Sequence, residues 1–350
     1  MRGDCIGCLL RNLILIKMMV EREQFKLERI LLEKQNELFQ KQETERYNNL
    51  MELREIYYKL KDIVNEKYYP EIQRLFPWYT DHGQKHVESI IHAMGDLLIH
   101  SYGRLNEMEV FILLCACIFH DTGMTISRNE HADNVKQIIQ NMRILITDIT
   151  VSRQINEIAR AHSSKRDLDQ LSLIDSCTFN DINYNVQTRA LAAMLRLADD
   201  ISETRYRIEP DLLSKVPEEN IIFWQYANAV ESVVISAADM NCKIKVSIPK
   251  SILLKEFKYA GSTKIFFEYV LERIEKSYKE RVLCSIEFRN IVVISAFEIE
   301  MKIMSDDMFD KIDGIKFEIN ENYFQTLSLK DAFYKKNPQW TIDALKKQYL

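Results

Sequence analysis

The sequence predicts a mainly α-helical protein that ends in a small α+β module. Of its 350 residues only 8 are Gly and 6 are Pro, a composition unlike that of sandwiches, barrels or disordered chains. From Glu21 to about Tyr69 there is no Gly or Pro, and Glu, Lys, Arg, Gln and Leu dominate, as they do in long helices. After Pro210 β-branched residues begin to alternate with polar ones, which is typical of strands.

The overall composition limits the number of domains, the kinds of partner and the cellular compartment that we expect for the protein. A length of 350 residues suits about two domains. We divide it into a helical extension (1–69), a helical domain (70–210) and an α+β module (211–350). The net charge of −5 argues against non-specific nucleic-acid binding over the whole surface and leaves room for a local basic groove. The cysteines are scattered and no export signal is convincing, so we expect reduced thiols and a cytoplasmic protein.

The N-terminal part is expected to be helical and to lie outside any membrane. Leu9–Val20 is apolar, but Arg11 and Lys17 interrupt it and it is too short to span a bilayer, so we expect an amphipathic helix and no integral membrane insertion. Within Glu21–Tyr69 the apolar spacing is helical without a clean heptad, which fits a coiled coil or a helical hairpin. We expect this part to join subunits into a homo-oligomer or to brace the next domain.

The helical domain begins after two prolines that are expected to break the preceding helix, Pro70 and Pro77. A helix is then predicted through Ile99. His82 and His86 stand at its start, and because they are four residues apart they share one face if both are helical.

The central stretch Val110–Gly123 reads V-F-I-L-L-C-A-C-I-F-H-D-T-G, and its long apolar run predicts a buried helix. Gly123 is expected to end this helix in the left-handed conformation. His120 and Asp121 therefore emerge where a core helix leaves the interior. They are metal-ligand types, although an aspartate at such a place can also just accept hydrogen bonds from backbone amides.

Further helices are predicted along the domain. They cover Glu130 to about Leu145 and Ser152–Ala161, the second ending at a histidine. Asp167–Asn185 is polar and is expected to be a mostly irregular surface loop over the site. The helix from Val186 onwards carries Asp199 out of a second apolar run.

The C-terminal module is predicted to hold a few strands and one long helix. The helix covers Thr263–Lys279, and the strands are Val230–Ala237, Lys243–Pro249, Ile291–Ile303 and Ile315–Ile319. The module contains no histidine, which argues against a second metal site there.

All seven histidines lie between residues 82 and 162. The ordered set His86, His120-Asp121 and Asp199 combines imidazoles with carboxylates, a mixture suited to Mn, Fe, Co or Zn. Three motifs carry these residues: D-H-G-Q-K-H-V ending at His86, I-F-H-D-T-G-M around His120, and L-R-L-A-D-D around Asp199. Over roughly residues 76–210 this pattern resembles the HD superfamily of metal-dependent phosphohydrolases. The H-D-T-G-M form is similar to the branch found in bacterial stress and antiphage conflict systems.

The resemblance implies an all-α domain with one or two divalent ions (Mn, Fe, Ni, Co, Zn or Mg) at its centre, bound by His86, His120, Asp121 and Asp199. Two-metal members use two more histidines, and His131 and His162 occupy that order; alternatively, His131 positions substrate or water. Asp121, His131 and His82 are the catalytic candidates. His82 is equally well explained as a packing residue. The candidate phosphate-binding residues are Arg196, Lys165, Arg166, Arg205 and Arg207, for each of which a surface role is the common alternative.

The function expected from these residues is hydrolysis of a phosphoester or phosphoanhydride bond of a nucleotide or a nucleotide-derived signal. The ion would polarise a phosphoryl oxygen and lower the pKa of a bound water. The alternatives are a metal-dependent nuclease on short single strands and a non-catalytic HD-fold sensor or scaffold. No G-x-S-x-G motif and no Gly-rich phosphate loop is present in the sequence.

Overall fold

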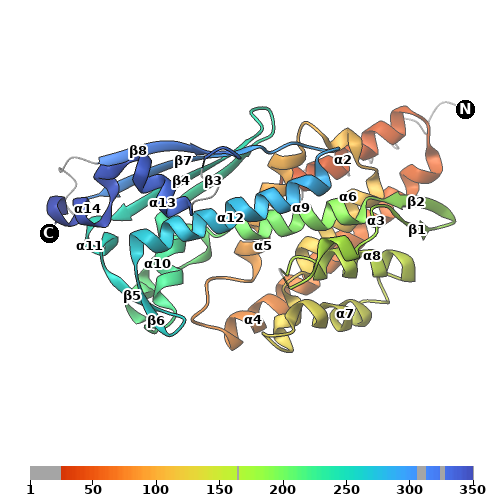
Figure 1. Ribbon diagram of the computed structural model, residues 1–350. Coiled ribbons are helices and arrows are strands. Elements are labelled where there is room, and N and C mark those ends of the chain that lie inside the picture. The colour runs from red at the N-terminus through yellow and green to blue at the C-terminus, as the bar shows by residue number, and fades with distance from the viewer. Residues whose placement is uncertain (1–24, 164, 306–312, 324–327, 350) are drawn as a thin grey trace, which may run out of the picture.

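The computed structural model describes residues 25–163, 165–305, 313–323 and 328–349 (Figure 1). The predicted amphipathic segment Leu9–Val20 lies outside these residues. The described chain forms a helical bundle and, at one end of it, a four-stranded sheet with helices packed beside it (Figure 1).

The N-terminal part is a helical hairpin that braces the bundle. It consists of α2 (Lys26–Gln40) and α3 (Thr44–Ile63), and the leucines of its inner face, such as Leu27 and Leu53, are fully buried. Gly95 of the bundle lets the hairpin approach, since a Cβ there would lie 2.5 Å from Lys26 Cβ. Of the two expected alternatives, this part of the chain therefore forms the helical hairpin. Oligomerisation stays a prediction.

Pro70 does not break the helix, contrary to expectation. A π-helical turn, Val64–Tyr68, follows α3 directly and leads into α4 (Tyr69–Leu75), with Pro70 in its first turn. The wider π turn accommodates a residue that lacks an N–H and crowds the preceding turn. The helix ends at Leu75, two residues before Pro77, because the residue before a proline disfavours the helical conformation.

The bundle is built around α6 (Glu107–Phe119), in which every residue is buried. Asn106 begins it with a capping box: the Asn106 side chain accepts from the Glu109 amide at 2.9 Å, and the Glu109 carboxylate accepts from the Asn106 amide at 2.8 Å. The surrounding helices are α5 (Gln84–Leu98), α7 (His131–Asn141), α8 (Ile149–Arg160) and α9 (Thr188–Ile201). Among the described residues, Glu107–Thr125 is apolar enough by length and composition to cross a membrane, but 94% of its most apolar window is buried in the protein.

The segment 167–185 is not the irregular loop that we expected. It contains the antiparallel hairpin β1 (Asp175–Phe179) and β2 (Ile182–Val186), whose two-residue turn places Asn180 and Asp181 at positive φ. The hairpin lies at the N-terminal end of α6, where the Asn106 side chain donates to the Asn185 carbonyl at 2.7 Å. It is thus at the opposite end of α6 from His120 and does not cover the histidines.

The C-terminal module contains the predicted strands and the predicted long helix, with two corrections: the strand expected from Ile291 begins at Ala296, and the helix expected to end at Lys279 continues to Phe288. The sheet has the order β3-β4-β7-β8, in which β4 and β7 are parallel and the other pairs antiparallel. The strands are β3 (Val230–Ser236), β4 (Asn241–Pro249), β7 (Ala296–Met304) and β8 (Asp313–Ile319), with a separate hairpin of β5 (Glu256–Tyr259) and β6 (Ser262–Ile265). The helices are α10 (Ile221–Ala229), α11 (Lys250–Leu253), α12 (Phe266–Phe288), α13 (Leu329–Lys336) and α14 (Ile342–Tyr349).

The long helix α12 joins the module to the bundle. It runs from the sheet to the side of α9 (Figure 1). Three ion pairs connect the two helices in antiparallel register: Arg196–Glu280, Asp200–Lys276 and Glu203–Arg273. We call these three pairs the α9–α12 ladder. One continuous cluster of buried residues reaches from Leu27 to Leu345, across the predicted boundary at residue 210. The division into three parts stays a prediction.

Candidate metal centre

Six predicted ligands converge at the centre of the bundle from five helices. Their side chains come from α5 (His86), the end of α6 (His120 and Asp121), the start of α7 (His131), the end of α8 (His162) and α9 (Asp199). The cluster is shielded from solvent, since His120 is 0% and His86 is 1% exposed. A rigid helical frame therefore holds imidazoles and carboxylates together without water around most of them.

Asp121 lies between two pairs of histidines. Its Oδ2 is 3.2 Å from His120 Nε2 and 3.8 Å from His86 Nε2. Its Oδ1 is 3.4 Å from His131 Nε2 and 3.6 Å from His162 Nε2. We call His86, His120, Asp121 and Asp199 the first subsite, because Asp199 Oδ1 lies 3.0 Å from His86 Nε2. Asp121, His131 and His162 form the second subsite.

The backbone fixes which ring nitrogen faces the cluster. Nδ1 of His120, His131 and His162 lies 2.8, 2.9 and 2.6 Å from the carbonyl oxygen three residues earlier in the chain. A carbonyl only accepts, so each Nδ1 carries the hydrogen, and each Nε2 is left to present a lone pair to the cluster. This is the tautomer that metal-ligating histidines adopt when a carbonyl holds the other nitrogen.

The resulting contacts need a cation or a proton. His131 Nε2 lies 2.9 Å from His162 Nε2, and His86 Nε2 lies 3.3 Å from His120 Nε2. The two lone pairs of His131 and His162 repel at such a distance, and a positive charge placed between or beside the nitrogens relieves this repulsion. His86 Nδ1 has no hydrogen-bond partner among the described residues, so the backbone does not fix the tautomer of His86. The residues present thus fit a divalent metal in each subsite, with nitrogen and oxygen donors that several ions accept.

The protonation of the metal-free cluster follows from burial and charge. Burial lowers the pKa of His86, and it lowers that of His162 to about 4, so both are neutral ligands at pH 7. Burial alone would also lower the pKa of His120, but the adjacent Asp121 carboxylate outweighs it and raises this pKa to about 9. Burial opposes ionisation of Asp121, yet His120 holds the pKa of this carboxyl well below its ordinary value.

Gly123 has a different role from the one expected. The α6 helix continues through His120 into a short 3-10 turn, Thr122–Thr125, and Gly123 is not among the described residues with positive φ. Glycine fits this position because it has no side chain. A Cβ there would lie 2.0 Å from the carbonyl oxygen of His131 and 2.9 Å from the amide nitrogen of Val135. The first turn of α7 can therefore rest on the backbone just after Asp121, which brings His131 to the cluster.

A cavity of about 270 Å³ opens over the cluster, which we call the metal cavity. Its walls include Asp121, His131, His162 and Asp199 and the predicted cations Arg196 and Arg207. Both arginines are already engaged: Arg196 pairs with Glu280, and Arg207 Nε donates to the Asp81 carbonyl at 2.7 Å.

The other predicted phosphate-binding residues lie farther out. Lys165 and Arg166 line a neighbouring cavity of about 590 Å³, which we call the outer cavity. Arg166 is paired there with Asp133. Arg205 is not brought to the cluster. It lines a separate cavity with Lys85 and pairs with Glu231 at 3.5 Å.

His82 lies in the wall of the metal cavity. Its Nδ1 is 2.5 Å from the Thr80 carbonyl, and its ring centroid is 5.8 Å from that of His86. Burial first, and then the charge of Arg207, lowers the pKa of His82 to about 3. The imidazole is therefore neutral at pH 7, so it is not an imidazolium acid in the metal-free protein.

Two cations that the sequence did not single out also line the metal cavity. Arg128 lies in the turn before α7, where its NH1 is 3.3 Å from His131 Nδ1. Its position three residues before His131 in the sequence could have identified it as a residue of the site. Lys276 comes from α12, and no local pattern could place it, since it reaches the cavity through the packing of α12 on α9.

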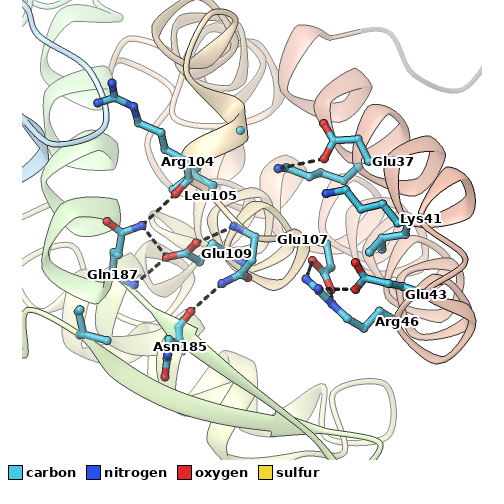
Figure 2. Close-up of a pocket in the computed structure, with 15 residues that line it drawn as sticks. Glu37, Lys41, Glu43, Arg46, Arg104, Leu105, Glu107, Glu109, Asn185 and Gln187 are labelled. Atoms are coloured by element: carbon cyan, nitrogen blue, oxygen red, sulfur yellow. Dashed lines mark hydrogen bonds and ion pairs between the residues drawn. The ribbon is translucent and has the colours of Figure 1, made fainter.

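Another cavity, of about 440 Å³, lies away from the metal cluster at the N-terminal end of α6. Figure 2 shows Arg46 held between Glu43 and Glu107, and Glu109 beside Gln187. The Glu109 carboxylate accepts from the Gln187 amide at 2.8 Å. The buried acids of this cavity are thus already satisfied, and Glu107 joins the N-terminal hairpin to α6 through Arg46.

Comparison with known proteins agrees with the geometry of the cluster. Searches of curated proteins and of solved structures find no match to this chain. The model of the HD-CE family, an HD-containing domain family, matches residues 76–276, which is more than half of the chain. The match covers every residue of both subsites and extends through Lys276 of α12. Together with the buried His/Asp cluster, it indicates a metal-dependent hydrolase. The chain belongs to the HD-CE family.

Proposed function

We propose that the protein is a metal-dependent phosphohydrolase that cleaves a phosphoester or phosphoanhydride bond of a nucleotide or a nucleotide-derived signal. The observation that carries this proposal is the position of Asp121, whose two oxygens face two separate pairs of histidines. A carboxylate shared in this way suits a pair of cations. His86, His120, Asp121 and Asp199 would hold one ion, and His131 and His162 with Asp121 would hold the other.

Bound divalent ions would supply Lewis acidity to a phosphoryl oxygen and to an attacking water. The chain's own residues would bind and orient the substrate. Arg128, Arg207 and Lys276 place positive charge in the wall of the metal cavity, where a phosphate would lie against the cluster. The burial of His120 and Asp121 keeps bulk water from the floor of the cavity, which strengthens these charge interactions.

The decisive experiment begins with the metal content of the purified protein. We expect Mn, Fe, Ni, Co, Zn or Mg to co-purify or to restore activity, and the proposal fails if none of them does. Nucleoside triphosphates, cyclic nucleotides and short single strands would then be incubated with the wild type and with Asp121→Ala. We expect hydrolysis of nucleotides by the wild type alone. Equal activity in the variant would remove the proposed site.

A nuclease acting on short single strands is the second candidate function. It is favoured by the adjacency of the cavities: Arg128 lines both the metal cavity and the outer cavity, so a strand could run past the ions. Hydrolysis of strands without hydrolysis of nucleotides would select this alternative. A non-catalytic sensor is disfavoured, because a scaffold has no physical need for this complete donor set. Membership of the antiphage branch stays a prediction.

A further inference from the structure

We propose that a nucleobase of the substrate binds in a third cavity beside the metal cluster. This cavity, which we call the aromatic cavity, has a volume of about 400 Å³ and is lined by Trp78, Tyr79 and Phe223. The proposal rests on the proposed function and adds to it the part of the substrate that the chain recognises.

The aromatic cavity adjoins the metal cavity. Both are lined by Arg128 and Asp199, and they also share His82, Asp200, Arg207 and Lys276. A ligand whose phosphate lies at the metal cluster would therefore have the aromatic cavity directly beside it. The volume of the aromatic cavity falls within the usual range for small-molecule sites.

The three aromatic rings come from two parts of the chain and are held by neighbours. Trp78 and Tyr79 follow α4, and the Trp78 carbonyl accepts from Trp224 Nε1 at 2.9 Å. Phe223 belongs to α10 and packs edge-on against Tyr269, with ring centroids 6.3 Å apart. Trp78 remains 37% exposed, so apolar ring surface is available to a ligand. Every nucleobase has a flat π-face that stacks on such rings.

The outer cavity does not offer the same chemistry. Among the described residues, Tyr79 is the one Phe, Tyr or Trp in its lining, and its charged residues include Arg128, Lys165 and Arg166. A base is therefore directed to the aromatic cavity, and further phosphate groups are directed past Arg128. Arg128 lies over the Tyr79 ring, 5.6 Å from its centroid, at the junction of the three cavities.

Polar groups in the aromatic cavity can read the edge of a base. Asn220, at the start of α10, is a lining residue, and a side-chain amide can both donate and accept. Asn220 and Phe223 both belong to the C-terminal module as we divide the chain, whereas Trp78 belongs to the helical domain. The proposed base subsite thus needs residues of both the helical domain and the C-terminal module.

The test compares binding of AMP, ribose 5-phosphate and inorganic phosphate to the full-length, Mn-loaded protein by calorimetry. We expect AMP to bind at least about tenfold more tightly than ribose 5-phosphate, a difference that stacking on aromatic side chains commonly supplies. Trp78→Ala and Phe223→Leu should abolish most of this difference. Phe39→Ala is the matched control, because Phe39 is 70% exposed on α2 and lines none of the three cavities.

The outcomes separate the two proposals. Equal binding of AMP and ribose 5-phosphate to the wild type overturns the base subsite and leaves the phosphohydrolase proposal standing. Failure of all three ligands to bind, together with no hydrolysis of any nucleotide, removes the proposed function itself. Thermal unfolding of each variant shows whether it is folded. If Phe223→Leu is not folded, Trp78→Ala decides the question, because this variant keeps the backbone carbonyl to which Trp224 donates. An unchanged AMP preference in Trp78→Ala then counts against the base subsite.

Discussion

The carbonyl oxygen of His131 occupies the space where a side chain on Gly123 would be, since a Cβ atom there would lie only 2.0 Å away. This contact places the first turn of α7 against the turn that follows Asp121. The two subsites are therefore joined by backbone packing as well as by the shared carboxylate.

Gly123→Ala should displace α7 and with it His131. We expect loss of the ion in the second subsite, retention of the ion in the first, and a lower free energy of unfolding by about 2 kcal/mol from overpacking. Elemental analysis and urea unfolding measure the two effects. Gly103→Ala is the control, because a Cβ at Gly103 meets no atom within 4 Å. Full metal content in Gly123→Ala would show that α7 can move without loss of the ion in the second subsite.

Asp121 and Asp199 should differ in how many ions depend on them. Asp121→Asn removes the charge that both subsites share, so affinity for both ions should fall by more than about tenfold. Asp199→Asn should weaken only the first subsite, because its carboxylate lies near His86 and His120. Titration with Mn²⁺ by calorimetry gives the stoichiometry of each variant. The shared-carboxylate arrangement would be refuted if the two variants retained the same number of ions.

The Glu203–Arg273 pair should contribute to stability more than an exposed ion pair. The two side chains are 12% and 19% exposed, so Arg273→Ala leaves a largely buried carboxylate without its cation and should cost about 3 kcal/mol. A double-mutant cycle with Glu203→Ala isolates the coupling. The Lys258–Glu218 pair, 62% and 64% exposed, is the matched control and should contribute less than the Glu203–Arg273 pair. Similar coupling energies for both pairs would argue against this account of the ladder.

Acidification should destabilise the metal-free protein through His82. Burial and Arg207 lower the pKa of His82 to about 3, against an ordinary value of 6.5. Between these values the unfolded chain binds more protons than the native one, so stability falls as the pH falls from 6.5 towards 3. His82→Asn should therefore lose about 2 kcal/mol less than the wild type on going from pH 7 to pH 5.

Urea unfolding in the presence of a chelator measures this difference at the two pH values. His100→Asn, a substitution at an exposed histidine outside the cluster, is the control and should lose as much stability as the wild type. If His82→Asn and the wild type lose the same amount, His82 is not held neutral by its surroundings.

Much of the fold could be predicted, because it depends on local patterns. The apolar run before His120 identified the core helix, and the β-branched runs identified the four strands of the sheet. The hairpin at Asn180-Asp181 was missed, although a two-residue turn of this kind between apolar residues is a recognised signal. The π turn before Pro70 was missed as well, since it is a response of the backbone to the proline that the residue pattern does not display.

The candidate site was predicted less completely than the fold. Its six ligands could be named because each stands at the end or the face of a predicted helix. That Asp121 lies between two histidine pairs depends on the packing of α7 and α8, which no local pattern contains. Arg205 was named as a candidate phosphate contact, but it pairs with Glu231 and lines another cavity, whereas Arg207, two residues later, lines the metal cavity. Lys276, in contrast, is 77 positions from Asp199 (276 − 199) and lines the same cavity.

The α9–α12 ladder also balances negative charge beside the metal cavity. Asp199 and Asp200 lie at the end of α9, Glu203 lies two residues beyond it, and all three line the aromatic cavity. Without Arg273 and Lys276 they would present three carboxylates to an approaching phosphate and slow its encounter with the protein. Under the proposed function, a helix that supplies no candidate metal ligand would thus ease the approach of an anion. The rate of association should consequently depend on ionic strength through residues of α12.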